Sequence, residues 1–271
     1  MDGHPGIARF PAISLATQAE FIEARRALQD RLDARHLHEA ALLAAGDTLI
    51  RPGTCAPCLR GAAFTTRLDR WPRAADGSRM ANWPEGQICD CADRLDGRAR
   101  AVVHFAQAVA GLRPWTRLLL FGPEQAAHRR LAALAGETVH AAALLPGDSA
   151  PGWTLPAPGR PVPLAVAIGC LHLVPPLDAA LAAFRAALAP GGSFVFTVPF
   201  RYDASATLTR ADLPRPGGRL PALLRTPAHD IGWDILDRLR RAGFAHAAAH
   251  FYWSGELGYL GAFNMIFHAA L

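Results

Sequence analysis

Four of the five cysteines lie in two close pairs, Cys55 with Cys58 and Cys89 with Cys91. A Cys-x2-Cys turn presents both sulfurs on the same side, so that two thiolates can reach one tetrahedral ion. The second pair supplies the other two ligands, although its Cys-x-Cys spacing is tighter than usual. We therefore predict a closed structural Zn²⁺ site formed by these four cysteines.

The tight spacing of the second pair leaves the fourth ligand open between Cys91 and a nearby residue such as His104 or an acid. Unrelated buried thiols or a redox pair are the competing interpretations, but two close pairs among only five cysteines favour a metal. A catalytic zinc is not indicated, since no open set of histidine and carboxylate ligands lies nearby. The metal would fold residues 51–92, whose Pro, Gly, Arg and Asp content makes little core.

The rest of the chain must supply the framework that positions these groups. From Asp93 onward, short apolar runs alternate with helical patterns, which indicates a parallel sheet covered on both faces. The last two strands follow each other without a helix and should form an antiparallel hairpin. Strands are expected at 117–121, 137–144, 164–168, 193–198, 247–253 and 262–269, and helices at 93–111, 124–135, 177–188 and 233–242.

The sequence predicts three parts. Residues 1–50 form a helical segment, because apolar residues recur at helical spacing over 15–45 and Gly46 follows. Residues 51–92 form the zinc-binding module. Residues 93–271 form the sheet domain, with a Pro-rich insertion over 201–227.

Composition limits the classes of function. The chain has 271 residues, of which 51% are hydrophobic, enough for a sizeable core, and 19% are charged, too few for a disordered polyelectrolyte. The net charge is +5, carried by arginine in the absence of lysine, but the arginines are scattered and many adjoin an acid, which argues against a nucleic-acid partner. The chain shows no apolar run of about 18 residues and no signal peptide, so we expect a cytoplasmic protein.

Two stretches resemble the second half of the class I S-adenosylmethionine (SAM) methyltransferases. They are Leu164–Asp178, which reads LAVAIGCLHLVPPLD, and Ala189–Pro199, which contains the turn Pro-Gly-Gly before a buried strand. Gly232–Phe244 resembles the late helix of that family together with the Ala-Gly-Phe sequence that leads from it into the sixth strand. Leu118–Glu124, preceded by Cys89-Asp-Cys91, resembles a subgroup with a cysteine cluster ahead of the sheet domain.

The resemblance covers roughly residues 85–271 and implies a Rossmann-like sheet that binds SAM beyond the carboxyl ends of its strands. His172 would be a general base toward a substrate hydroxyl or amine, or else a hydrogen-bonded loop residue. Glu124 would face the SAM amino group or stabilise a helix dipole. Cys170 would more simply be a packing residue than a nucleophile. The cofactor-binding residues implied are Phe121, Gly122, Pro123, Glu124, Leu144, Gly169, Cys170 and Leu171.

Other side chains have two interpretations each. His229 and Asp230 could point into the same cleft, although Asp230 is better explained as the N-cap of the next helix. Tyr252, Trp253 and Tyr259 near the final hairpin are better explained by packing or a dimer surface than by a substrate box.

Three positions depart from the family pattern. Only Gly122 remains of the glycine-rich loop, the second strand ends at Ala143-Leu-Leu-Pro146 without the acid that holds the ribose, and Pro163 replaces an aspartate. The leading hypothesis is a SAM-dependent methyltransferase acting on a small-molecule hydroxyl or amine. The departures favour the alternative, a non-catalytic partner or scaffold protein with the same fold. A zinc-dependent nucleic-acid binder has only Arg94, Arg98 and Arg100 in its support.

Overall fold

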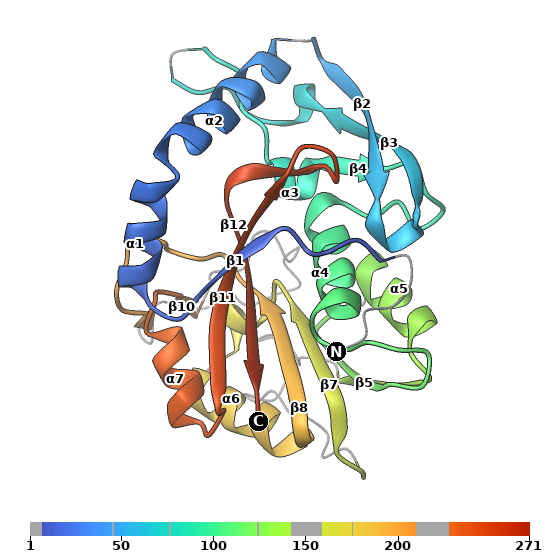
Figure 1. Ribbon diagram of the computed structural model, residues 1–271, viewed down its shortest axis with the longest axis vertical. Helices are drawn as coiled ribbons and strands as arrows, with labels where there is room; N and C mark the ends of the chain where they lie inside the picture. Colours follow the sequence, from blue (N-terminus) through green and yellow to red (C-terminus); the bar gives the residue numbers. More distant parts are fainter. Residues whose placement is uncertain are drawn as a thin grey trace, which may run out of the picture.

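A seven-stranded sheet forms the centre of the computed structural model, which describes residues 7–44, 46–75, 77–123, 125–141, 159–174, 176–209 and 228–271. The strand order is β1-β11-β12-β8-β7-β5-β6 (Figure 1). The parallel strands are β5 (Arg117–Phe121), β6 (Glu137–Ala141), β7 (Val162–Ile168) and β8 (Leu188–Thr197). Strands β5 and β7 are buried over almost their whole length, which explains their uninterrupted apolar sequences.

The antiparallel half of the sheet is the predicted C-terminal hairpin, β11 (His246–Ser254) and β12 (Tyr259–Ala270). Strand β12 pairs with β8, so the hairpin continues the parallel sheet. At the outer edge, β1 (Ala12–Leu15) pairs with β11, an element that the sequence analysis did not predict. The mixed α/β sheet with a terminal hairpin confirms the predicted fold class.

Helices cover both faces of the sheet (Figure 1). Helices α4 (Gly97–Ala108) and α5 (Ala126–Leu134) pack on one face, and α6 (Leu177–Ala187) and α7 (Ile235–Arg241) on the other. Each face has its own apolar core. Phe184, Phe194 and Phe196 belong to the core under α6, whereas Phe105, Leu118 and Val166 belong to the core under α4.

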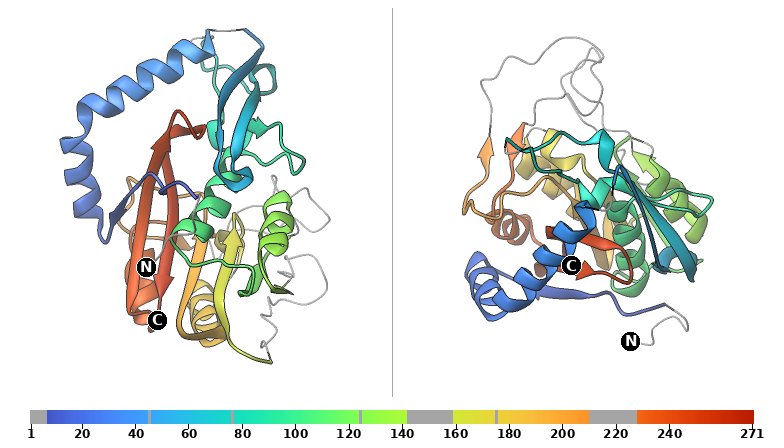
Figure 2. Two further views of the ribbon diagram at one scale, coloured as in Figure 1. Left: turned by 45° about the vertical axis from the view of Figure 1, so that its right-hand side comes forward. Right: turned by 90° about the horizontal axis from the view of Figure 1, so that it is seen from above.

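The N-terminal helix is broken into α1 (Gln18–Ala27) and α2 (Gln29–Leu43), which meet at Leu28. Together they arch beside the hairpin (Figure 2). The arch is fastened by buried Glu39, whose Oε1 accepts hydrogen bonds of 2.8 Å from the Trp253 indole and from the Gly261 backbone N–H. The predicted helix over 15–45 is therefore two helices, because the chain bends at Leu28 to reach this anchor.

The cysteine segment folds as a small antiparallel sheet of β2 (Thr48–Cys55), β3 (Arg60–Arg67) and β4 (Gln87–Cys89). The shorter elements of the chain are η1 (Ala56–Cys58), η2 (Leu68–Arg70), α3 (Trp83–Gly86), η3 (Leu171–Leu173), β9 (Leu208–Thr209) and β10 (His229–Asp230). Among the described residues, no helix is both long and apolar enough to cross a membrane.

Candidate metal centre and cofactor edge

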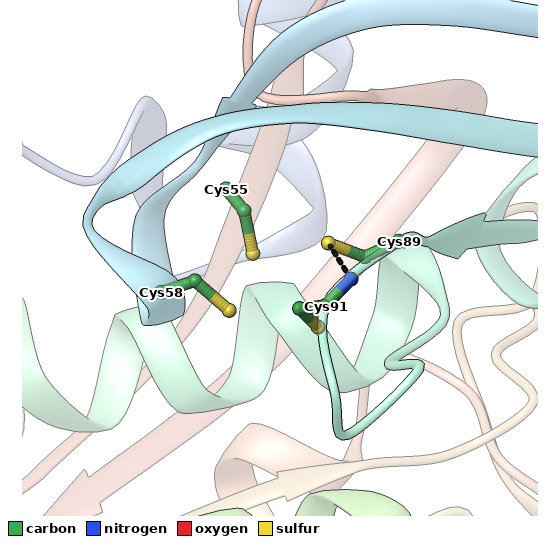
Figure 3. A group of neighbouring side chains, drawn as sticks. All are labelled: Cys55, Cys58, Cys89 and Cys91. Carbon is green, nitrogen blue, oxygen red and sulfur yellow. Dashed lines mark hydrogen bonds between the residues drawn. The ribbon is translucent and has the colours of Figure 1, made fainter.

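The four paired cysteines converge on one point (Figure 3). Cys55 ends β2 and Cys58 lies in the turn that follows, while Cys89 ends β4 and is brought opposite by the pairing of β3 with β4. All four sulfurs lie within 4.8 Å of one another. Cys91 thus takes the fourth position. His104 lies outside the group, since its ring nitrogens contact the Ala8 carbonyl at 2.6 Å and the Tyr259 hydroxyl at 3.1 Å.

The geometry of the cluster fits zinc. A Zn–S distance of about 2.3 Å in a tetrahedral site places sulfurs roughly 3.8 Å apart, so the side chains need to close by about 1 Å at most. The cysteines are unpaired by disulfides, and Cys55, Cys89 and Cys91 are buried. The Cys91 N–H donates to the Cys89 sulfur over 3.4 Å, a bond that favours the thiolate.

Burial alone disfavours four ionised sulfurs. It raises the pKa of the Cys55 thiol well above its usual range and that of Cys58 to about 11. The pKa of Cys91 is lowered although burial opposes this, because backbone N–H groups of Leu95 and Arg94 donate to its sulfur. A bound cation would reverse the effect of burial, since it supplies the positive charge that stabilises thiolates.

A second observation also fits a metal. Arg100 is fully buried, with its guanidinium 3.9 Å from the centre of the Phe64 ring, and Phe64 pairs with Cys89 across the strands. Arg100 donates to the Gly258 carbonyl at 2.8 Å and to Gln87 at 3.2 Å, but its Nε and Nη1 have no partner in the described part of the chain. Zinc with four thiolates carries net negative charge, which would offset this buried cation.

The carboxyl ends of β5 and β7 form a second candidate site. Phe121 lies beside Ala167, and the residues that continue these strands include Gly122, with φ +112°, and Gly169, with φ +62°. Both conformations favour glycine because a side chain would be strained there. Cys170 packs between the strand ends with its thiol 3.5 Å from the Phe121 carbonyl, and burial raises its pKa to about 12. A neutral packing thiol, rather than a nucleophile, follows from this environment.

His172 lies in η3, just beyond β7. Burial, followed by the positive charge of Arg98, lowers the pKa of His172 to about 4. Its Nδ1 is buried and has no hydrogen-bond partner among the described residues. The imidazole is therefore neutral at pH 7.

Sequence reasoning missed the position of Arg98. Its Nη2 lies 2.8 Å from Glu85, and its Nη1 lies 3.7 Å from where a Cβ on Gly169 would be. The sequence signal was its place at the start of a helix just after the second cysteine pair. Arg94 is exposed and Arg100 buried, so the three arginines do not form one basic surface.

The remaining predicted residues divide into three groups. Glu124 and Leu144 lie outside the described residues. Leu171 is buried in the core under α6, and Pro123 is exposed at the strand end. Tyr252 and Tyr259 are buried, and the Trp253 indole bonds Glu39, in agreement with the packing interpretation.

The interpretation of Asp230 as a helix N-cap is wrong. Asp230 lies in β10, and the residue that precedes α7 is Asp234, because Trp233 and Asp234 form a turn before the helix. His229 forms hydrogen bonds with the Val174 carbonyl at 3.2 Å and the Thr209 hydroxyl at 3.1 Å. These contacts indicate a structural role for His229.

No protein-family model matches the chain, and no curated protein matches its sequence. Solved structures similar to it include a methyltransferase in complex with the Trm112 methyltransferase activator of Haloferax volcanii, at 12% identity and a TM-score of 0.44, over 65% of this chain and 94% of that one. A SAM-dependent methyltransferase from Mesorhizobium loti has 18% identity and a TM-score of 0.38, over 64% and 96%. The N-methyltransferase NodS from Bradyrhizobium japonicum, solved with S-adenosylhomocysteine, has 14% identity and a TM-score of 0.36, over 64% of this chain and 84% of that one.

Each of these three similar structures contains a protein named as a methyltransferase. The fold of this chain is defined by its own strand order, β1-β11-β12-β8-β7-β5-β6.

Proposed function

We propose that the chain is a SAM-dependent methyltransferase that acts on a hydroxyl or amine of a small molecule, with a structural zinc. The observation that carries the proposal is the pair of positive-φ glycines, Gly122 and Gly169, at the adjacent carboxyl ends of two parallel strands. In an open α/β sheet this edge is where nucleotide-like ligands bind. The absence of a side chain on Gly169 lets a ligand approach the backbone closely, whereas at Gly122 the space that a Cβ would take is filled by Cys170.

In this proposal, Phe121, Gly122 and Pro123 contact the methionyl part of SAM, with Gly169, Cys170 and Leu171 on the other side, and Glu124 and Leu144 complete the set. When bound, SAM supplies an electrophilic methyl group on a sulfonium. The chain would contribute alignment of that methyl group with the acceptor, which is worth about 7 kcal/mol or more in favourable cases. His172, whose imidazole is neutral at pH 7, would accept the acceptor's proton.

The zinc would be structural, because four cysteine ligands leave no open coordination position. It would hold β2 and β4 together and fix the cysteine module against α4. A protein partner or a second copy of the chain stays a prediction, as does the division into residues 1–50, 51–92 and 93–271.

The alternative is a non-catalytic partner or scaffold protein that has lost tight SAM binding. It is favoured by the single glycine of the loop and by the low pKa of His172, which makes the imidazole a weak base. Calorimetric titration with S-adenosylhomocysteine separates the two. The methyltransferase proposal expects one binding site per chain, and no heat at millimolar ligand would overturn it in favour of the scaffold.

A further inference from the structure

An ion pair links the cysteine module, residues 51–92, to the sheet domain near the carboxyl ends of β5 and β7. Glu85 lies in α3, four residues before Cys89, and its Oε1 is 2.8 Å from Nη2 of Arg98 in the first turn of α4. Arg98 is about one-quarter exposed, so the pair is shielded from part of the solvent. The metal module thereby fixes a side chain that faces the other site.

The packing around this pair is tight. A Cβ on Gly97 would lie 3.1 Å from the Pro84 carbonyl, so α3 and α4 are in backbone contact where Arg98 emerges. Asp96 caps α4 by accepting the Ala99 N–H at 2.7 Å, which fixes the start of the helix. The direction of Arg98 is therefore set by the backbone of both helices as well as by Glu85.

The second end of the guanidinium is aimed at the strand edge. Nη1 lies 3.7 Å from the Cβ position of Gly169, and the charge of Arg98 acts on His172. An arginine held by a carboxylate on one side and open on the other is a donor fork for a second anion. Gly169 has no side chain to obstruct that approach.

We propose that Arg98 binds the carboxylate of the methionyl part of the cofactor, and that Glu85 and the occupied cysteine site hold it in position. The inference rests on the proposed function, which places the methionyl part between the ends of β5 and β7. It makes the metal module a component of the cofactor site rather than a remote support. Arg98 is the residue that would contact the ligand, whereas Glu85 is a positioning residue.

The test compares two ligands by calorimetry, S-adenosylhomocysteine and 5′-methylthioadenosine, which lacks the amino-acid part. Arg98→Gln should weaken the affinity for S-adenosylhomocysteine roughly 10- to 100-fold, as expected for loss of a charge-assisted hydrogen bond. The affinity for methylthioadenosine should stay within about twofold of the wild-type value. Glu85→Gln and partial chelation of zinc should also weaken the binding of S-adenosylhomocysteine relative to that of methylthioadenosine, but by a smaller factor. Arg67→Gln, which removes an exposed ion pair with Asp69 in the same module, should change neither ligand.

The outcomes are distinct. If both ligands bind the wild-type protein and Arg98→Gln weakens them equally or not at all, the assignment of Arg98 is overturned while the proposed function stands. If neither ligand binds the wild-type protein, the proposed function itself fails. If Arg98→Gln shows the selective loss but Glu85→Gln and zinc removal do not, the coupling to the metal module is overturned.

Discussion

A Cβ atom on Gly122 would lie 2.8 Å from the sulfur of Cys170. Gly122 also has a φ of +112°, so both its backbone and its surroundings require glycine. The thiol of Cys170, just beyond β7, thus restricts the residue that can follow β5 to glycine. This contact links the two segments that would enclose the cofactor.

Gly122→Ala should lower the free energy of unfolding by about 2 kcal/mol, because backbone strain and the contact with Cys170 add together. Cys170→Ala in the same chain should recover part of that loss by removing the contact, which a double-mutant cycle in urea will measure. The matched control is Gly191→Ala, since Gly191 has φ +70° but open space around its Cβ position. A Gly191 variant that couples to Cys170 as strongly as Gly122 does would contradict this explanation.

Purified protein should contain about one zinc per chain, and Cys58→Ser should remove most of it, because a three-sulfur site is open to water and exchange. Mass spectrometry of metals measures both contents. Cys170→Ala is the control, because Cys170 lies outside the four-cysteine cluster and its loss should leave the zinc content unchanged. Full zinc retention in Cys58→Ser would show that the cluster is not the site.

Arg100→Met should lower the free energy of unfolding by about 3 kcal/mol, because the buried hydrogen bonds to Gly258 and Gln87 are lost. It should also speed the transfer of zinc to a chromogenic chelator, since the buried positive charge no longer offsets the thiolates. Arg60→Met, which removes a half-exposed arginine paired with Asp90, is the matched control. Equal rates of zinc release from Arg100→Met and Arg60→Met would contradict the proposed electrostatic role of Arg100 at the metal site.

Acid should destabilise the fold through two histidines on the hairpin. Burial lowers the pKa of His250 and of His268 to about 4, so the unfolded chain binds more protons than the folded one between about pH 6.5 and 4. Stability therefore falls as the pH is lowered through that range. His250→Gln should flatten the profile by on the order of 2 kcal/mol, measured as urea unfolding against pH. A profile identical to that of the wild type would mean that His250 does not titrate as described.

The parts that the sequence predicted are those set by local pattern. The apolar run at Arg117–Phe121 and the cysteine pairs each carry their own signal, because burial on both faces and ligand chemistry restrict the residue types allowed. The predicted turn at Pro-Gly-Gly is instead part of β8, which begins at Leu188, although Gly191 does have a positive φ of +70°. Strand β1 has only four residues, and its pairing with β11 depends on a contact some 240 positions away in sequence. No local pattern encodes such a contact.

The same distinction holds at the candidate site. The cysteines were predicted from their type and spacing, and Gly122 and Gly169 from the resemblance to the methyltransferases, but Arg98 was considered only as part of a basic group. Its position depends on the packing of α3 against α4, where Gly97 meets the Pro84 carbonyl. The break of the long helix at Leu28 is also tertiary in origin, since it lets Glu39 reach the hairpin.

The most direct test is a crystal structure of the zinc-loaded protein soaked with S-adenosylhomocysteine. We expect ligand density along the ends of β5 and β7, with the sulfur near Gly122 and the carboxylate within hydrogen-bond distance of Arg98. An empty strand edge at saturating ligand, or density confined to another part of the surface, would contradict the account.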